Sequence, residues 1–329
     1  MKKTFLFIFA FLIVFVISDR ILNIVKPSVY KFSESLGWET KPDYKRSFFE
    51  KDLYGNQYKI DYQTDENGAR VSGSKSAKYS ILVIGDSFTM DAHTSNDLSW
   101  FGQLRLDLER VLNKEIIIYA IGGGGYGTNQ QYIKTKNFLK NTKLEPKIVI
   151  LQFCINDFMN NSYEWEKQTE NYGQYLRRPY FVDNSHFYFD NSTLGKIMRN
   201  KYFSYLKSPN YLMLIFGIIE SKYFPKSIKI DTKNESVVIT KQLINKLSKL
   251  FDNNNFYIFN CKEGTEYPEN IWFDVLDKSE VNILKNPSFE MKKISETKKI
   301  FFRDGGHYNE LGNKLLGNLV SKDLKFLLE

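Results

Sequence analysis

Ser87 has the neighbours that a nucleophilic serine needs. It follows the apolar run 81–84 and the turn Gly85-Asp86. A short apolar run closed by a turn is typical of a buried strand in a parallel sheet, and ligands bind just beyond the carboxyl ends of such strands. On that turn, at the start of a helix, the serine hydroxyl and its own backbone N–H face a cleft together, which suits nucleophilic attack on a carbonyl. The alternative is that Asp86-Ser87 only caps a helix.

A serine nucleophile needs a general base, and the chain has only three histidines, His93, His186 and His307. His307 follows Asp304 by three residues in a glycine-rich stretch that precedes a helical pattern. In such a loop the carboxylate can hold one ring nitrogen while the other faces the serine. We expect His93 to be a surface residue and His186 to lie in an insertion. Histidines this scattered do not indicate a metal site.

Two further segments follow apolar runs and are expected at the same edge of the sheet. The run 122–127, rich in glycine, follows the strand pattern 115–120. It lacks the lysine and hydroxyl residue of a phosphate loop and the spacing of a dinucleotide fingerprint, so we expect a turn in which the backbone closely approaches another group. The strand pattern 147–153 delivers Asn156-Asp157 to this edge. The alternative for that pair is an ordinary turn.

These motifs, in this order, resemble those of the SGNH, or GDSL-type, hydrolase superfamily, and the resemblance runs from about Gly85 to the C-terminus. The four matching segments are Gly85-Asp-Ser-Phe88, the glycine turn ending at Gly125, Ile155-Asn-Asp157 and Asp304-Gly-Gly-His307. The resemblance implies that His307 is the base and Asp304 its partner. It implies an oxyanion hole built from the amides of Ser87 and Gly125 and the side chain of Asn156, with the glycine's register open within Gly122–Gly125. The chain departs from the pattern at Cys154, where a glycine is usual.

The superfamily's fold is a three-layer α/β/α sandwich around a mostly parallel five-stranded sheet, of the flavodoxin-like SGNH hydrolase type. The sequence alternates strand and helix patterns as that fold requires. The fifth run is either a short strand or an extended approach to His307. The expected strands are 81–84, 115–120, 147–153, 256–259 and 299–302, and the expected helices are 100–112, 128–139, 236–251 and a last helix through Leu327.

We expect three parts in the chain. Residues 1–26 pair Lys2-Lys3 with a long apolar run, which predicts a signal anchor that crosses a membrane as a helix; cleavage after Ser18 and a buried core helix are the alternatives. Residues 27–79 form an N-terminal extension with a small β-hairpin, in which Arg70 is expected to be a structural clamp. Residues 80–329 form the hydrolase-like domain, with an insertion at about 158–232. The expected location is a membrane, with the catalytic domain on the periplasmic or extracellular side, or a secreted protein after cleavage.

Composition excludes several classes. The 329 residues are 42% apolar and 16% aromatic, which indicates a packed globular protein. The net charge of +8 is scattered, so we expect no nucleic-acid partner; a basic exterior suits anionic lipids, an acidic polysaccharide or plain solubility. Cys154 and Cys261 are the only cysteines. We expect no metal and no cofactor. Buried free thiols are the default for these cysteines, with a disulfide as the alternative if their strands are neighbours.

The predicted function is therefore that of a serine esterase acting on O-acyl or O-acetyl groups of a cell-envelope glycan through a Ser-His-Asp triad and an acyl-enzyme. One alternative is an O-acyltransferase that passes the same acyl group to an exported polysaccharide. The other is a carbohydrate-binding module without catalysis. The sequence determines neither the substrate nor the oligomeric state.

Overall fold

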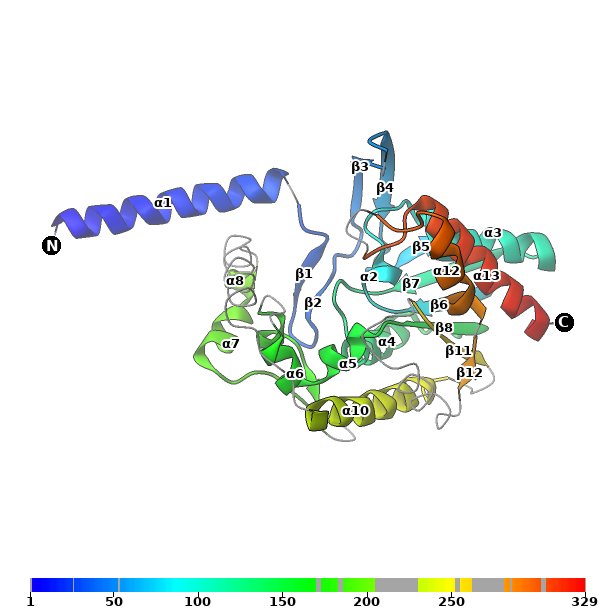
Figure 1. The fold of residues 1–329 in the computed structure, drawn as a ribbon. Coiled ribbons are helices and arrows are strands. Elements are labelled where there is room, and N and C mark those ends of the chain that lie inside the picture. Colours follow the sequence, from blue (N-terminus) through cyan, green and yellow to red (C-terminus); the bar gives the residue numbers. More distant parts are fainter. Residues whose placement is uncertain are drawn as a thin grey trace. The chain divides into compact units, whose positions relative to one another are not determined.

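A computed structural model describes residues 2–25, 27–52, 54–169, 173–182, 186–204, 230–251, 255–261, 281–284, 286–302 and 306–328. The chain divides into two compact units (Figure 1). Unit 1 comprises Met1–Glu39 and Tyr163–Thr232, and unit 2 comprises Thr40–Ser162 and Lys233–Glu329.

Unit 2 is built on a six-stranded sheet with the order β12-β11-β8-β6-β7-β5. Five of these strands run parallel, and β5 pairs antiparallel with β7 at one edge. The central strands are buried on both faces, which explains their continuous apolar runs. The strands are β5 (Arg70–Ser72), β6 (Tyr79–Ile84), β7 (Ile116–Ile121), β8 (Ile148–Phe153), β11 (Phe256–Asn260) and β12 (Asn282–Ile283).

Helices cover both faces of this sheet (Figure 1). On one face, α3 (Trp100–Leu112), α12 (Asn286–Thr297) and α13 (Glu310–Leu328) pack into the main hydrophobic core. On the other face lie α4 (Thr128–Thr142), α5 (Asn156–Asn161) and α10 (Ile230–Ser248). Helix α3 shows why the sequence folds this way, because Trp100, Leu104 and Leu108 recur at helical spacing and are all fully buried.

The predicted α/β fold with a mostly parallel sheet is confirmed, but the sheet has six strands and not five. Residues 299–302 form only an isolated bridge between Phe301 and Tyr308, so they are the extended approach. The fifth parallel strand is β12, and β5 adds a sixth strand. Both are too short to show a periodic pattern, since β12 has two residues and β5 has three.

The remaining short elements of unit 2 precede α3 in the chain. Strands β3 (Lys45–Lys51) and β4 (Gln57–Gln63) form an antiparallel hairpin. The single-turn helix α2 (Ser87–Met90) and the 3-10 helix η1 (Asn96–Leu98) separate β6 from α3.

Unit 1 contains a long N-terminal helix and several short elements. Helix α1 (Lys2–Val25) exposes apolar side chains, among them Val14 at 62% and Ile24 at 79%. Within the part of the chain that the structure describes, no helix combines the length and apolarity that crossing a bilayer requires, so the expected transmembrane helix has no support here. The short elements are β1 (Tyr30–Ser33), β2 (Gly37–Thr40), α6 (Tyr163–Gln168), η2 (Gln174–Leu176), β9 (Tyr180–Phe181), β10 (Phe187–Tyr188), α7 (Thr193–Met198) and α8 (Lys201–Ser204).

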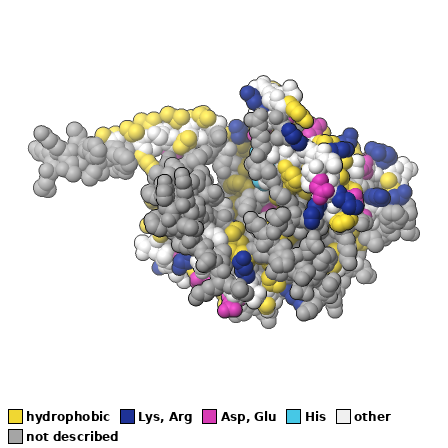
Figure 2. Space-filling model, in the orientation of Figure 1, with side chains coloured by type: hydrophobic (Ala, Val, Ile, Leu, Met, Phe, Trp, Pro, Cys, Tyr) yellow, Lys and Arg dark blue, Asp and Glu magenta, His cyan; other side chains and the backbone are white. Residues whose placement is uncertain are grey.

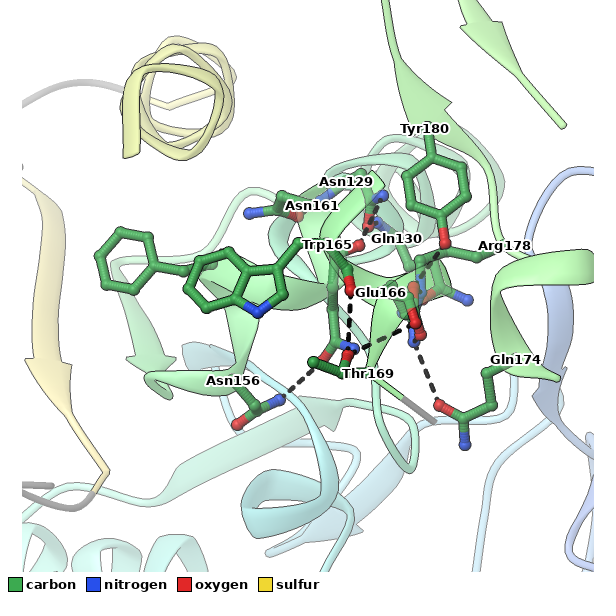
Figure 3. A network of polar contacts seen from close by, with 12 residues as sticks. Asn129, Gln130, Asn156, Asn161, Trp165, Glu166, Thr169, Gln174, Arg178 and Tyr180 are labelled. Carbon is green, nitrogen blue, oxygen red and sulfur yellow. Dashed lines mark hydrogen bonds and ion pairs between the residues drawn. The ribbon is translucent and has the colours of Figure 1, made fainter. Parts of the chain in front are cut away.

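A buried ion pair organises unit 1 (Figure 3). Arg178 Nε donates to Glu166 Oε2 at 2.6 Å, and a terminal guanidinium nitrogen donates to Oε1 at 2.9 Å. The Tyr180 hydroxyl donates to the same carboxylate. Both charged side chains are fully buried. The bidentate geometry offsets the cost of removing two charges from water.

Candidate active site

Three neighbouring strands of unit 2 end at one edge of the sheet. Strand β6 lies between β7 and β8, and Ile84 is in register with Ile121 on one side and Leu151 on the other. The chain leaves these strands toward Ser87, the glycine turn and Asn156 respectively. The carboxyl ends of parallel strands meet at a common edge, so the structure brings together three of the predicted site segments.

Ser87 is the first residue of α2 and is half-buried. Asp86 caps this helix, because its Oδ1 accepts a hydrogen bond from the Phe88 N–H at 2.9 Å. Gly85 permits the tight turn. A Cβ atom there would lie 2.2 Å from Thr89 Oγ1 and 3.0 Å from the Gln152 carbonyl oxygen. Asp86 can therefore cap the helix while Ser87, the predicted nucleophile, remains available for catalysis.

The glycine turn approaches the Ser87 turn closely, as predicted. A Cβ atom on Gly122 would lie 2.8 Å from the Asp86 carbonyl oxygen. Gly125 is half-buried and has a φ of +68°, a left-handed conformation that favours glycine. Among Gly122–Gly125, only Gly125 has a positive φ. Its role as an oxyanion donor stays a prediction.

Asn156 is the first residue of α5 and is half-buried. Its Nδ2 donates to Asn160 Oδ1 at 2.9 Å (Figure 3). The same side chain hydrogen-bonds to the carboxylate of Asp86.

Asp86 is a buried carboxylate at the centre of this edge, with 1% of its surface exposed. Burial raises the pKa of Asp86 to about 6, although hydrogen bonds from Phe88 N–H and Asn156 favour its charged form. The Cys154 Sγ atom lies 3.3 Å from its Oδ1.

His307 comes from the far end of the chain and lies beside the residue that follows Ser87. Its ring centroid is 5.1 Å from that of Phe88. The backbone before α13 holds it there, because the Phe302 N–H donates to the His307 carbonyl oxygen at 2.9 Å. His307 is half-buried. Its expected partner Asp304 lies outside the described residues.

His93 lies at the surface, as expected, with 36% of its side chain exposed, but it also lies beside His307. Its ring centroid lies 5.7 Å from that of His307 and 5.1 Å from that of Phe302. Its Nδ1 lies 3.8 Å from a carboxylate oxygen of Glu50. Helix α2 ends after one turn, and Asp91 has a left-handed φ of 35° that turns the chain back toward the site. The sequence alone gave no sign that His93 lies near His307. His186 lies in unit 1 and is exposed.

Arg70 is the structural clamp that the sequence predicted, since it is 1% exposed. It donates hydrogen bonds to the carbonyl oxygens of Met90, Asp91 and Thr94 and to the side chain of Asn96. The clamp fixes the loop that follows α2.

The cysteines form a disulfide between Cys154 and Cys261, with a Cα–Cα distance of 5.1 Å. The default expectation of free thiols is therefore wrong. The predicted alternative, a disulfide between neighbouring strands, is confirmed, because β8 and β11 are neighbouring parallel strands. Cys154 stands two residues before Asn156, and the Cys261 carbonyl oxygen accepts a hydrogen bond from the Tyr308 hydroxyl, next to His307. The disulfide thus joins two segments that lead to the site.

Within the described residues, no group of three or more His, Cys, Asp or Glu side chains is placed to hold a metal ion.

No family model matches the sequence, and no curated protein matches it. Solved structures with a similar fold include a lipase/acylhydrolase from Enterococcus faecalis, at 14% identity and a TM-score of 0.42, covering 75% of this chain and 96% of that one. The psychrotrophic esterase EstA from Pseudoalteromonas sp. is 11% identical with a TM-score of 0.41, over 76% of this chain and 99% of that one. The acetylxylan esterase Axe2 from Geobacillus stearothermophilus is 10% identical with a TM-score of 0.41, over 75% and 94%. All three TM-scores lie below 0.5.

Proposed function

We propose that this chain is a serine esterase of the SGNH type. The observation that supports it best is the common sheet edge, where Ser87, the glycine turn and Asn156 leave three adjacent strands. The His307 ring packs on Phe88, the residue next to Ser87. A nucleophile, a base and oxyanion donors at one edge are the parts that acyl transfer requires.

In the proposed mechanism, His307 accepts the Ser87 proton as Oγ attacks the ester carbonyl. The oxyanion is held by the amides of Ser87 and Gly125 and by the side chain of Asn156. The ester C–O bond then breaks, and the alcohol leaves with the proton from His307. Water, deprotonated by the same imidazole, releases the acyl group as a carboxylic acid and restores Ser87. Asp304 is proposed to orient the imidazole.

The first test is labelling with a fluorophosphonate probe. Ser87→Ala should abolish labelling and lower ester hydrolysis by about 10³-fold or more, with unchanged circular dichroism. His307→Ala should have a similar effect, whereas His93→Ala should keep most of the activity, which separates the two neighbouring histidines. The exposed Ser74 provides the matched control, since Ser74→Ala should label like the wild type.

Persistent labelling of Ser87→Ala would reject Ser87 as the nucleophile. The substrate is proposed to be a small O-acyl ester, such as an O-acetyl group on a cell-envelope glycan. A panel of short-chain esters and acetylated sugars, assayed with and without a polysaccharide acceptor, distinguishes hydrolysis from transfer to a sugar hydroxyl.

We further propose that the protein is exported and that residues 1–26 direct this export, either as an anchor or as a cleaved signal. Two features support the proposal. The described side chains of α1 include exposed apolar residues, and the Cys154–Cys261 disulfide suits an oxidising compartment.

A further inference from the structure

Asn313 is a buried polar residue on an apolar face of α13, and the proposed mechanism does not use it. It is 1% exposed, and it precedes the buried residues Leu316, Val320 and Leu324 at helical spacing. An apolar side chain is the ordinary choice at such a position, because a buried amide without hydrogen bonds costs free energy. The partners of the Asn313 amide therefore show what this position requires.

The Asn313 amide joins three segments of unit 2. Its Oδ1 accepts a hydrogen bond from the Trp100 N–H, at the start of α3, at 2.9 Å. Its Nδ2 donates to the Tyr308 carbonyl oxygen at 3.2 Å and to Thr94 Oγ1 at 3.3 Å. Tyr308 follows His307 directly, and Thr94 lies in the loop after α2. Asn313 thus fastens the segment that carries His307 to α3 and to the loop after α2.

Gln152 makes a second connection, on the indole side of Trp100. It lies in β8 and is fully buried. Its Oε1 accepts hydrogen bonds from the Trp100 indole Nε1 at 3.0 Å and from the Thr89 hydroxyl at 2.8 Å. Thr89 is the third residue of α2, the helix that begins at Ser87. Within the described residues, Gln152 Nε2 has no hydrogen-bond partner, so the oxygen of this amide is the atom that matters for the connection.

The two connections form one buried path between the two segments that carry the proposed nucleophile and base. All its members are at most 3% exposed, and they are, in order, Tyr308, Asn313, Trp100, Gln152 and Thr89. The two ends of the path also meet directly. The Phe88 ring packs on the rings of His307 and Tyr308, with centroid distances of 5.1 and 5.3 Å. Directional hydrogen bonds in a densely packed interior hold such ends in one arrangement.

We infer that Asn313 and Gln152 are positioning residues of the proposed esterase site, and that together they fix the loop of His307 relative to the helix of Ser87. The inference rests on the proposed function. Proton transfer from Ser87 to His307 requires the two side chains to approach within hydrogen-bonding distance, and a displacement of about 1 Å can cost about a hundredfold in rate. Both positioning residues are buried and act only through the placement of the nucleophile and the base.

The decisive variants are Asn313→Leu and Gln152→Met, which keep the approximate size of each side chain and remove its hydrogen bonds. Each should lower the rate of fluorophosphonate inactivation, and kcat for a short-chain ester, by about ten- to a hundredfold with KM unchanged. The rates are measured at a temperature at which circular dichroism shows each variant folded. Wild-type rates in both variants would overturn the inference.

A double variant tests whether the two residues act as one path. Because both connections pass through Trp100, breaking the second should add little, and the rate of the double variant should lie within about threefold of the slower single variant. Two losses that multiply would contradict a common path. Gln152→Glu keeps an acceptor oxygen, so it should react at least about threefold faster than Gln152→Met, although a buried carboxyl lowers its thermal midpoint.

Glu109→Leu is the matched control. Glu109 lies near the other end of α3, where its carboxylate accepts hydrogen bonds from the Ile116 N–H at 2.9 Å and from Arg105 at 2.6 Å. Ile116 begins β7, at the end of that strand opposite to the site. This variant should lower the thermal midpoint and keep the wild-type rate while it is folded. If the rates of all variants simply follow their thermal midpoints, the path has only a structural role and the inference is wrong.

A second measurement does not depend on catalysis. Nuclear Overhauser effects between the selectively labelled rings of His307 and Phe88 report their packing. These effects should weaken in Asn313→Leu and Gln152→Met and persist in Glu109→Leu. Undiminished effects in the first two variants would refute the inference. A wild-type protein that neither labels nor hydrolyses esters, yet loses this packing in the two variants, would reject only the proposed function.

Discussion

At the scale of single residues, Asp86 links the proposed nucleophile, Ser87, to the proposed oxyanion donor Asn156. Its carboxylate accepts hydrogen bonds from the backbone after Ser87 and from the Asn156 side chain. The motif resemblance gives this aspartate no chemical role. In the structure it lies between the Ser87 turn and Asn156, and its burial raises its pKa to about 6.

The sign of the resulting pH dependence can be worked out. The pKa of Asp86 is about 6 in the folded protein, against 3.8 for the free side chain. The folded state therefore binds this proton more tightly, and the associated stability is full below pH 3.8 and is lost as the pH rises through 6. The loss amounts to roughly 3 kcal/mol.

Asp86→Asn removes this titration. The difference in unfolding free energy between the variant and the wild type should therefore rise in favour of the variant between pH 4 and pH 7, as measured by urea denaturation. Asp52→Asn is the control, because hydrogen bonds lower the pKa of the exposed Asp52 and its difference should run in the opposite direction. A flat difference for Asp86→Asn would contradict the buried-carboxylate account.

At the scale of elements, the disulfide fastens two strand ends that lead to the site. It closes a separation of 107 residues between Cys154 and Cys261. Cys154 stands where the motif resemblance expects a glycine, and the bond to Cys261 accounts for this departure. The turn toward Asn156 is fixed by a covalent link to β11.

Replacing both cysteines with alanine should therefore lower the unfolding free energy by about 2–5 kcal/mol, because the unfolded chain gains freedom. Urea denaturation measures this loss, and a reductant should destabilise the wild type but not the double variant. Thiol blocking of the protein taken directly from cells tests its location as well. Reactive free thiols on Cys154 and Cys261 would contradict both the link and the proposed export.

At the scale of the whole molecule, the two units have different cores. Unit 2 has a large apolar core around its sheet, whereas unit 1 contains the fully buried pair of Glu166 and Arg178 beside buried apolar residues such as Leu36 and Leu176. On the face drawn in Figure 2, basic side chains stand among acidic ones rather than in one patch. On that face the basic residues are therefore dispersed, as the sequence indicated.

Arg178→Met should destabilise unit 1 selectively, since it leaves Glu166 buried without its partner, at a cost of about 3–5 kcal/mol. Hydrogen exchange should show lost protection in α6, β9 and β10, while β6, β7 and β8 stay protected. Lys31→Met provides the control, because the Lys31–Glu39 pair is partly exposed and should contribute less than about 1 kcal/mol. Protection lost equally in both units would contradict the separate-core description.

The sequence by itself determined the elements with strong local patterns. Four buried strands were predicted from continuous apolar runs, and helix α3 from its periodicity, because each pattern is contained in a few neighbouring residues. The placement of Ser87, the glycine turn and Asn156 at one edge of the sheet followed from the direction of those strands.

Only the tertiary structure decided the contacts between distant segments. The Cys154–Cys261 bond, the approach of His93 to His307 and the buried position of Asp91 depend on which strands are neighbours and on where α2 ends. The strand β12 escaped prediction because two residues show no period. Such features are set by long-range packing, which leaves no local trace in the order of amino acids.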